Sequence, residues 1–567
     1  MYIRQYETTL GDPFLSESPP SFSLECQELV KRRNAQKQIR VAVVGGGFAG
    51  LMAARWLGQS GFDVTVFEAR NQVGGRVLSN STWSKGRITE EGAELIGSFH
   101  TTWLKLAREY GLAMISRMNS ELYEQAQLHV RLRLGRDISM DEFVQLEKTM
   151  RTRVLEPLAR DATQIQDPSR PWLQPTLRSE DLRRVGDVLK SRYNVSPNEL
   201  LWKMLEFKLV NDEVAPLEQM NFLGLLCKVR AGQRMRFRFE DHRDKTGPLM
   251  RYWDELEIFR CADGCQALAT KMAEEFQSNG FQKKYRAKTK LHLSVAVTCI
   301  DLAQSKTQGV ILWFRKVIDQ RQEKFAPVAI FSRYDYVILA VPPSVWTRIQ
   351  FTPTAWHPKN EIGTLGMNPA VKFFSDVKKR FWIERGFAPY GGSSNIGQVW
   401  EGTDNQTRTV LGKIPDPRGG VLEVKQGIVL SVFAGPIKPG GHVPAPGDFT
   451  GELTHLYPDY PSNLNKTLFS NWPLEPFIKT GYASPRLGEI FSIVKKLNEP
   501  FHNLLFFAGE HTRMDFFGYM EGALRSGERA AQLLMQHSCG LLEKPAPVSP
   551  MRVATAGAAP IRANAGL

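Results

Sequence analysis

Residues 41–50, VAVVGGGFAG, decide the fold of this chain of 567 residues. An apolar run typical of a buried strand leads into a G-x-G-x-x-G pattern formed by Gly45, Gly47 and Gly50. In a strand–loop–helix unit these glycines allow a tight turn, close approach of the backbone to a pyrophosphate, and close helix–strand packing. The helix that follows directs its N-terminus at the phosphate. The stretch therefore predicts a dinucleotide-binding βαβ unit.

The next residues complete this unit. Residues 51–57 are predicted to be helical, and residues 64–67 form a short strand that ends at Glu68. A carboxylate at this position accepts hydrogen bonds from the ribose hydroxyls, whereas a phosphorylated ribose requires an arginine. A lone glycine pattern is often an ordinary turn, but the complete ordered unit favours binding of a dinucleotide whose adenosine ribose carries no additional phosphate. No second unit of this kind is apparent, which counts against a flavin reductase or monooxygenase that also binds NADPH.

Length and charge narrow the classes of protein further. A chain of this length exceeds what one core usually holds, so we expect two interleaved domains and tails. The 73 basic and 59 acidic residues give a formal net charge of +14, but the basic residues are spread along the chain. This pattern predicts a solvated basic surface and no nucleic-acid partner.

Cysteines and hydropathy predict a protein without structural metal or membrane contact. The N-terminus lacks an apolar signal region, and no run of about 18 apolar residues occurs, so we expect a cytoplasmic protein. A homodimer remains open. The cysteines lack the spacing of a zinc site or a disulfide framework and are expected to be reduced thiols: Cys26, Cys227, Cys261, Cys265, Cys299 and Cys539.

The segments along the chain predict a discontinuous α/β organisation. Residues 295–300 and 310–314 look like a hairpin, and residues 336–340 like a buried strand. The expected division is an N-terminal extension over 1–38, a dinucleotide-binding domain over 39–100, 255–345 and 500–540, a largely helical substrate domain over 101–254, a substrate-binding domain over 346–499, and a disordered tail over 541–567.

The C-terminal part carries two further motifs. Residues 504–507 form an apolar strand followed by Ala508-Gly509-Glu510, which places an acid directly after the strand. Residues 518–523, GYMEGA, open a final helix that is expected to run to about His537. Glycines here permit backbone contact with a flat ring, and the helix N-terminus stabilises negative charge on it.

Together with Gly74-Gly75-Arg76-Val77, these motifs resemble the flavin-dependent amine oxidases, which include monoamine and polyamine oxidases, histone demethylases of this class and L-amino-acid oxidases. The resemblance covers about residues 39–537. It implies bound FAD and a Rossmann-like FAD-binding domain interleaved with a mixed α+β substrate-binding domain and a helical insertion. Gly481 stands where animal monoamine oxidases place a flavin-bonded cysteine, so the resemblance implies noncovalent FAD.

The resemblance also implies roles for individual residues. Lys372 matches the lysine that contacts flavin N5 through water, and Tyr482 and Tyr519 match two aromatic walls that flank the substrate amine. An exposed strand lysine and core tyrosines are the alternative interpretations. Motif and resemblance together assign cofactor binding to Gly45, Gly47, Phe48, Ala49, Gly50, Glu68, Ala69, Arg70, Gly75, Arg76, Gly92, Ala93, Glu94, Val297, Gly509, Glu510, Gly518, Tyr519 and Met520.

The implied reaction is oxidation of an amine with oxygen as electron acceptor, giving an imine that hydrolyses and hydrogen peroxide. The general layout is most similar to microbial L-amino-acid oxidases, which predicts oxidative deamination of L-amino acids to 2-oxo acids and ammonia. A carboxylate substrate needs a guanidinium clamp, for which Arg234, Arg236 and Arg238 are candidates. A primary amine or polyamine oxidase, with Glu384 or Glu401 lining a channel, is the alternative. A decarboxylating monooxygenase and a noncatalytic FAD-binding protein are more remote.

Overall fold

A computed structural model of the chain describes residues 7–8, 10–13, 38–116, 127–239, 247–303, 309–404, 406, 414–415, 421–422 and 427–540. The predicted tail over 541–567 and most of the extension over 1–38 lie outside these residues, as does Cys26. The described part of the extension forms backbone pairs with later strands. Strand β1 (Glu7–Thr8) pairs with β7 (Met114–Ser116), and β2 (Leu10–Pro13) pairs with β10 (Phe237–Phe239).

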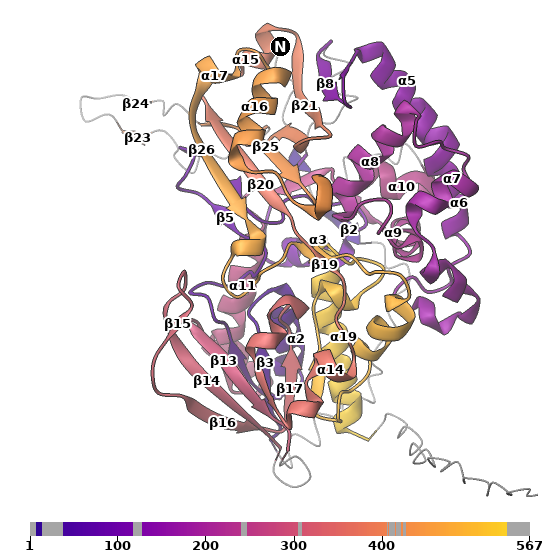
Figure 1. Ribbon diagram of the computed structural model, residues 1–567. Coiled ribbons are helices and arrows are strands. Elements are labelled where there is room, and N and C mark those ends of the chain that lie inside the picture. The colour runs from indigo at the N-terminus through magenta and orange to yellow at the C-terminus, as the bar shows by residue number, and fades with distance from the viewer. Residues whose placement is uncertain are drawn as a thin grey trace, which may run out of the picture.

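A five-stranded parallel sheet lies at the centre of the dinucleotide-binding part (Figure 1). Its strands are supplied by four separate stretches of the chain, within residues 40–67, 289–292, 336–339 and 505–507. Their apolar side chains are buried on both faces, which is typical of parallel sheets. In spatial order the strands are β12 (Thr289–His292), β4 (Asp63–Phe67), β3 (Arg40–Val44), β17 (Tyr336–Leu339) and β28 (Leu505–Phe507).

Helices α2 (Phe48–Gln59) and α19 (Met520–Ser538) pack against each other beside this sheet (Figure 1). Both contribute small residues to the contact: a Cβ atom at Gly527 would lie 2.2 Å from the carbonyl oxygen of Ala49. The predicted hairpin is confirmed as the antiparallel pair β13 (Val295–Asp301) and β14 (Val310–Asp319), to which β16 (Ile330–Tyr334) adds.

A seven-stranded, mostly antiparallel sheet forms the second domain, with α16 (Pro446–Leu456) packed on it. The rings of Phe449 and Phe373 stack at this contact with centroids 4.9 Å apart. In spatial order the strands are β26 (Leu464–Asn471), β20 (Val371–Val377), β25 (Ile428–Ala434), β22 (Gly397–Glu401), β21 (Phe387–Ser393), β8 (His129–Arg133) and β9 (Asp137–Ile138).

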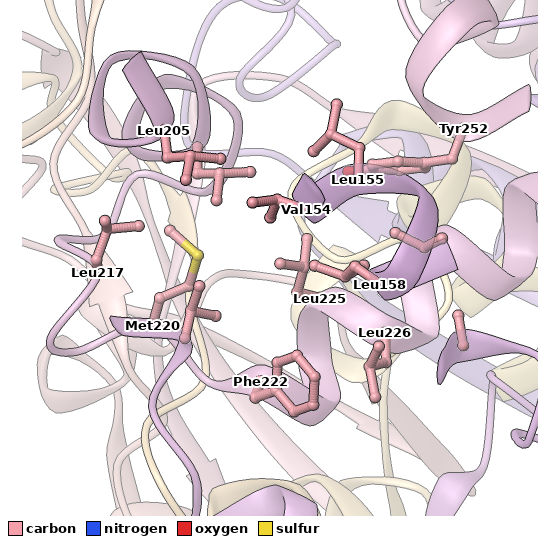
Figure 2. Close-up of a cluster of buried hydrophobic side chains, with 14 of the residues drawn as sticks. Val154, Leu155, Leu158, Leu205, Leu217, Met220, Phe222, Leu225, Leu226 and Tyr252 are labelled. Atoms are coloured by element: carbon pink, nitrogen blue, oxygen red, sulfur yellow. The ribbon is translucent and has the colours of Figure 1, made fainter. Parts of the chain in front are cut away.

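The segment expected to be largely helical has helices that share one apolar core (Figure 2). It is not helical throughout, because β8 and β9 join the sheet of the second domain through β21. The helices are α5 (Met140–Met150), α6 (Glu156–Ala162), α7 (Val185–Ser191), α8 (Leu200–Glu213), α9 (Phe222–Arg234) and α10 (Gly247–Glu255).

Candidate active site

A cavity of about 560 Å³ lies at the carboxyl edge of the parallel sheet and continues to the second domain. Gly45, Glu68, Ala340 and Gly509, which line it, follow the ends of four of the strands. Ligands of open α/β sheets bind at this edge. Such a volume is within the usual range of cofactor and substrate pockets.

The glycine loop forms one end of the cavity. Gly45 has a φ of +112°, and a Cβ atom there would lie 2.9 Å from the carbonyl oxygen of Ala340. Gly47 precedes α2 and forms a bridge with Gly74, so the two glycine motifs meet. Gly50 does not line the cavity. A Cβ atom at Gly50 would lie 1.9 Å from the carbonyl oxygen of Gly45, so this glycine permits helix packing instead of ligand contact.

Glu68 is held in a fixed orientation beside this loop. Its Oε2 accepts a hydrogen bond from the Gly46 amide at 2.6 Å, and its Oε1 accepts one from the Arg70 amide at 2.8 Å. Burial raises the pKa of the Glu68 carboxyl, although the two amides oppose this. Each carboxylate oxygen keeps acceptor capacity for a ribose hydroxyl. The acceptor capacity of Glu68 fits an adenosine, and the room that the glycines leave in the loop fits a pyrophosphate.

Arg76 and Glu510 join three segments of the chain at the cavity wall. Arg76 Nη1 donates to Glu510 Oε1 at 2.7 Å and to the Gly481 carbonyl at 2.9 Å. The amide of Gly518 donates to Glu510 Oε2 at 2.7 Å. Burial opposes ionisation of Glu510, but Arg76 keeps the pKa of this carboxyl below its usual value. A Cβ atom at Gly481 would lie 2.7 Å from Ala370 Cβ, so this position has no room for a larger side chain.

Lys372 lies on β20 and is buried, with 4% of its surface exposed, unlike an ordinary strand lysine. Its ammonium donates to Glu94 Oε2 at 2.7 Å and to the carbonyls of Glu90 and Gly92. Glu94 also accepts from Arg260 Nε at 2.7 Å. Burial opposes ionisation, yet Lys372 and Arg260 lower the pKa of Glu94 to about 2. A charged lysine is therefore fixed at the wall of the cavity.

Tyr482 and Tyr519 both line the cavity. Tyr482 donates to the Asn211 carbonyl at 3.1 Å, and the Tyr519 hydroxyl lies 3.0 Å from that of Tyr252. A Cβ atom at Gly518 would lie 2.8 Å from the Tyr482 ring, so this ring packs against the backbone of the residue that precedes Tyr519. Burial and nearby carboxylates raise the pKa of both phenols well above the usual value, so both stay neutral.

The other residues assigned from sequence also line the cavity: Phe48, Ala49, Ala69, Arg70, Gly75, Gly92, Ala93, Val297 and Met520. His100 and His511 do not line it. Burial lowers the pKa of each to about 4, which keeps both imidazoles neutral near pH 7. Among the described residues no cluster suited to a metal ion occurs, and Cys227, Cys261, Cys265, Cys299 and Cys539 form no disulfide. None of the described helices is long and apolar enough to cross a bilayer.

The sequence interpretation missed the acids at the substrate end of the cavity. Asp212, at the end of α8, and Glu257, just after α10, both line it. Asp212 Oδ2 is buried, accepts no hydrogen bond, and lies 3.7 Å from Lys208 Nζ. Acids inside a helical stretch carry no local motif, so only the folded chain reveals that they face the tyrosines.

The charged residues proposed from sequence for substrate recognition lie elsewhere. Arg234 and Arg236 do not line the cavity, and the side chain of Arg238 is outside the described residues. Glu384 pairs with Lys379, and Glu401 pairs with Arg380; neither acid lines the cavity. The arginines that line the cavity in the described part of the chain, Arg70, Arg76 and Arg348, each lie beside a carboxylate.

Comparisons with known proteins agree with this architecture. Residues 48–535 match the family described as flavin containing amine oxidoreductase. A flavin-containing amine oxidase of Danio rerio is 23% identical over 524 residues, covering 87% of this chain and 85% of the relative. Human lysine-specific histone demethylase 2 is 22% identical over 501 residues, covering 87% of this chain and 53% of the relative.

Solved structures share the fold at low identity. A double mutant of putrescine oxidase has a TM-score of 0.65 at 20% identity, covering 88% of this chain and 99% of that structure. Cyclohexylamine oxidase from Brevibacterium oxydans has a TM-score of 0.63 at 17% identity, with the same coverage of 88% and 99%. Mouse L-amino-acid oxidase is 43% identical, but over 76 residues, which is 13% of this chain and 12% of the relative.

Proposed function

The chain belongs to the family of flavin-containing amine oxidoreductases. From that premise we propose that its substrate is a primary amine that carries a second positive charge and no carboxylate. The supporting observation is that two acids, Asp212 and Glu257, line one wall of the cavity, and that the buried Oδ2 of Asp212 has no hydrogen-bond partner and lies 3.7 Å from the ammonium of Lys208. A buried carboxylate without full pairing favours a cationic ligand and disfavours a second anion. Among the described residues, each arginine that lines the cavity lies beside a carboxylate.

The chain's own residues would hold FAD noncovalently. Glu68 and the glycine loop would hold the adenosine and pyrophosphate, and Arg76, Glu510 and the start of α19 the flavin end. Bound FAD supplies the acceptor for the hydride equivalent lost from the carbon that bears the amine. In the overall reaction a primary amine, O₂ and water would give an aldehyde, ammonia and hydrogen peroxide.

Tyr482, Tyr519 and Lys372 would then prepare the reaction. The two neutral phenols exclude water from the reacting nitrogen and favour its uncharged form, which has the free electron pair that oxidation requires. Lys372 would stabilise negative charge that develops on the side of the cavity nearest Glu94. Asp212 and Glu257 would bind the second cation and orient the carbon chain.

Substrates of matched length test this proposal. The FAD-bound protein is mixed without oxygen with 1,4-diaminobutane, butylamine, L-norvaline or L-ornithine, and loss of flavin absorbance is followed. We expect reduction to be fastest with the diamine. Asp212→Asn should lower kcat/KM for the diamine about tenfold, the effect of losing one charge-assisted contact, and change that for butylamine little. Glu384→Gln, at an exposed ion pair, is the matched control and should change neither.

Oxidation of L-amino acids is the second candidate, favoured by the short match to mouse L-amino-acid oxidase. Tyr482 and Asp212 are 270 residues apart, so a match of 76 residues does not include the whole substrate end. Rapid flavin reduction by L-norvaline without reduction by either amine would establish this candidate and contradict the diamine proposal. It would also require an arginine that turns toward the cavity when substrate binds.

A further inference from the structure

Behind Tyr519 lies a buried polar cluster that takes no part in lining the cavity. It consists of Glu213 at the end of α8, Lys228 on α9 and Tyr252 on α10. Lys228 Nζ donates to Glu213 Oε2 at 2.8 Å, and the two side chains are 0% and 1% exposed. Tyr252 donates to Glu213 Oε1 at 3.3 Å, and its hydroxyl lies 3.0 Å from that of Tyr519.

The lysine also contacts the ring of Tyr519 directly. Lys228 Nζ lies 4.6 Å from the centroid of this ring and 4.0 Å from that of Phe517. Both distances are within the range of cation–π contacts, which gain strength when water is excluded. Tyr519 is therefore held at its hydroxyl by Tyr252 and at its ring by Lys228.

Stability alone does not account for such a cluster. Removing two charges from water costs several kcal/mol per ion, and well-packed apolar residues often replace a buried pair without loss. One side of the cluster is apolar, since Tyr252 belongs to the same buried cluster as Leu155 and Leu158 (Figure 2). Gly232 keeps α10 close, because a Cβ atom there would lie 2.8 Å from Tyr252 Cβ. The cluster thus has one fixed geometry, and Tyr519 is the residue through which it contacts the cavity.

We propose that Glu213, Lys228 and Tyr252 are positioning residues that set the orientation of Tyr519 against the substrate amine. These three residues would thereby control the reacting site without touching substrate. The inference rests on the proposed amine oxidation. It predicts that the hydroxyls of Tyr252 and Tyr519 affect the reaction as one unit.

A double-mutant cycle tests whether the hydroxyls of Tyr252 and Tyr519 act together. Tyr252→Phe, Tyr519→Phe and the double variant are prepared with FAD, and the limiting rate constant of flavin reduction is measured with the amine of the four-compound panel that reduces the wild type fastest. Loss of one hydrogen bond should slow reduction about three- to tenfold in each single variant. The double variant should be no slower than the slower single variant, because both changes remove the same contact.

Controls separate positioning from stability. Tyr457→Phe removes a similar buried hydrogen bond, to the carbonyl of Ala388 at 3.0 Å, and should lower the melting temperature without slowing reduction. Multiplying effects in the double variant, or an unchanged rate in Tyr252→Phe, would overturn the proposal. If no amine reduces the wild type, the proposed function fails first. The same cycle on melting temperatures then still decides whether the two hydroxyls are coupled, and additive temperatures would overturn the positioning role.

Discussion

Glu90 is a buried carboxyl that is close to the cavity wall but does not line it. Its Oε2 accepts from Ser79 Oγ at 2.6 Å and its Oε1 from the Cys265 amide at 2.7 Å. Burial is the main cause that raises its pKa to about 7, and the hydrogen bonds from Ser79 and the Cys265 amide oppose this rise. The folded protein therefore keeps a proton on Glu90 that the unfolded chain loses near pH 4.5.

This shift predicts a pH-dependent loss of stability. Between the unfolded and folded pKa values the folded state binds more protons, so stability falls as the pH rises and stays low above about pH 7. Glu90→Gln removes the titration and keeps an acceptor for the Cys265 amide. Its melting temperature should match that of the wild type near pH 4.5 and exceed it increasingly up to pH 8. The corresponding gain in the free energy of unfolding should be roughly 3 kcal/mol at most. A difference that is constant with pH would contradict the assignment.

The sequence predicts the positions of some site residues better than those of others. Gly45 and Gly518 belong to motifs that need a close approach of the backbone, and Glu68 follows the end of a strand in the same kind of motif, so local sequence suffices to predict them. The burial of Lys372 depends on Glu94, which is 278 residues away, and the place of Asp212 depends on where α8 ends. Gly50 shows the reverse case, since its motif position is correct but its contact is with Gly45 rather than with the cavity.

At the scale of elements, the packing of α19 on α2 fixes the start of α19 at the flavin end of the cavity. Gly527→Ala would place a Cβ atom 2.2 Å from the Ala49 carbonyl and 2.9 Å from Met52 Cβ. Overpacking of this kind costs about 1–3 kcal/mol or more, so we expect a lower melting temperature and weaker retention of FAD. Gly451→Ala, in α16 with open space around the new methyl group, should instead be neutral or slightly stabilising.

Equal behaviour of the two alanine variants would show that α19 can move away from α2 without cost. Absorbance of protein-bound flavin after gel filtration, together with thermal unfolding, distinguishes these results.

The elements foreseen from sequence are those with strong periodicity. Strands β17 and β28 and helix α19 lie where the apolar patterns place them, because buried parallel strands and long amphipathic helices carry their own signal. Strands β8 and β9 were not expected. They are short, and their identity depends on pairing with β21, which follows more than 200 residues later in the chain.

At the scale of the whole molecule, the cavity is built from segments that meet only in the folded chain. The parallel sheet and its following loops contribute residues from Gly45 to Met520, and the second domain contributes Lys372 and Trp400. The sequence predicts that the chain returns to its first domain, because residues 336–340 and 504–507 carry their own apolar pattern, but it does not predict the order of the strands or the presence of β12. The approach of α8 and α10 to the tyrosines could not be predicted either, since it results from packing of the helical core against both domains.

Because the bound cofactor would contact so many separate segments, its removal should loosen the molecule as a whole. A ligand that binds the folded state alone stabilises it by about 2.7 kcal/mol at a concentration one hundred times its Kd. We expect the melting temperature of the FAD-free protein to rise steadily with added FAD. FMN, which lacks the adenosine for which Glu68 supplies acceptors, should raise it much less. Glu68→Ala should reduce the response to FAD and leave the response to FMN unchanged. Equal stabilisation by FAD and FMN would instead place all of the binding energy at the flavin end, beside Arg76 and the start of α19.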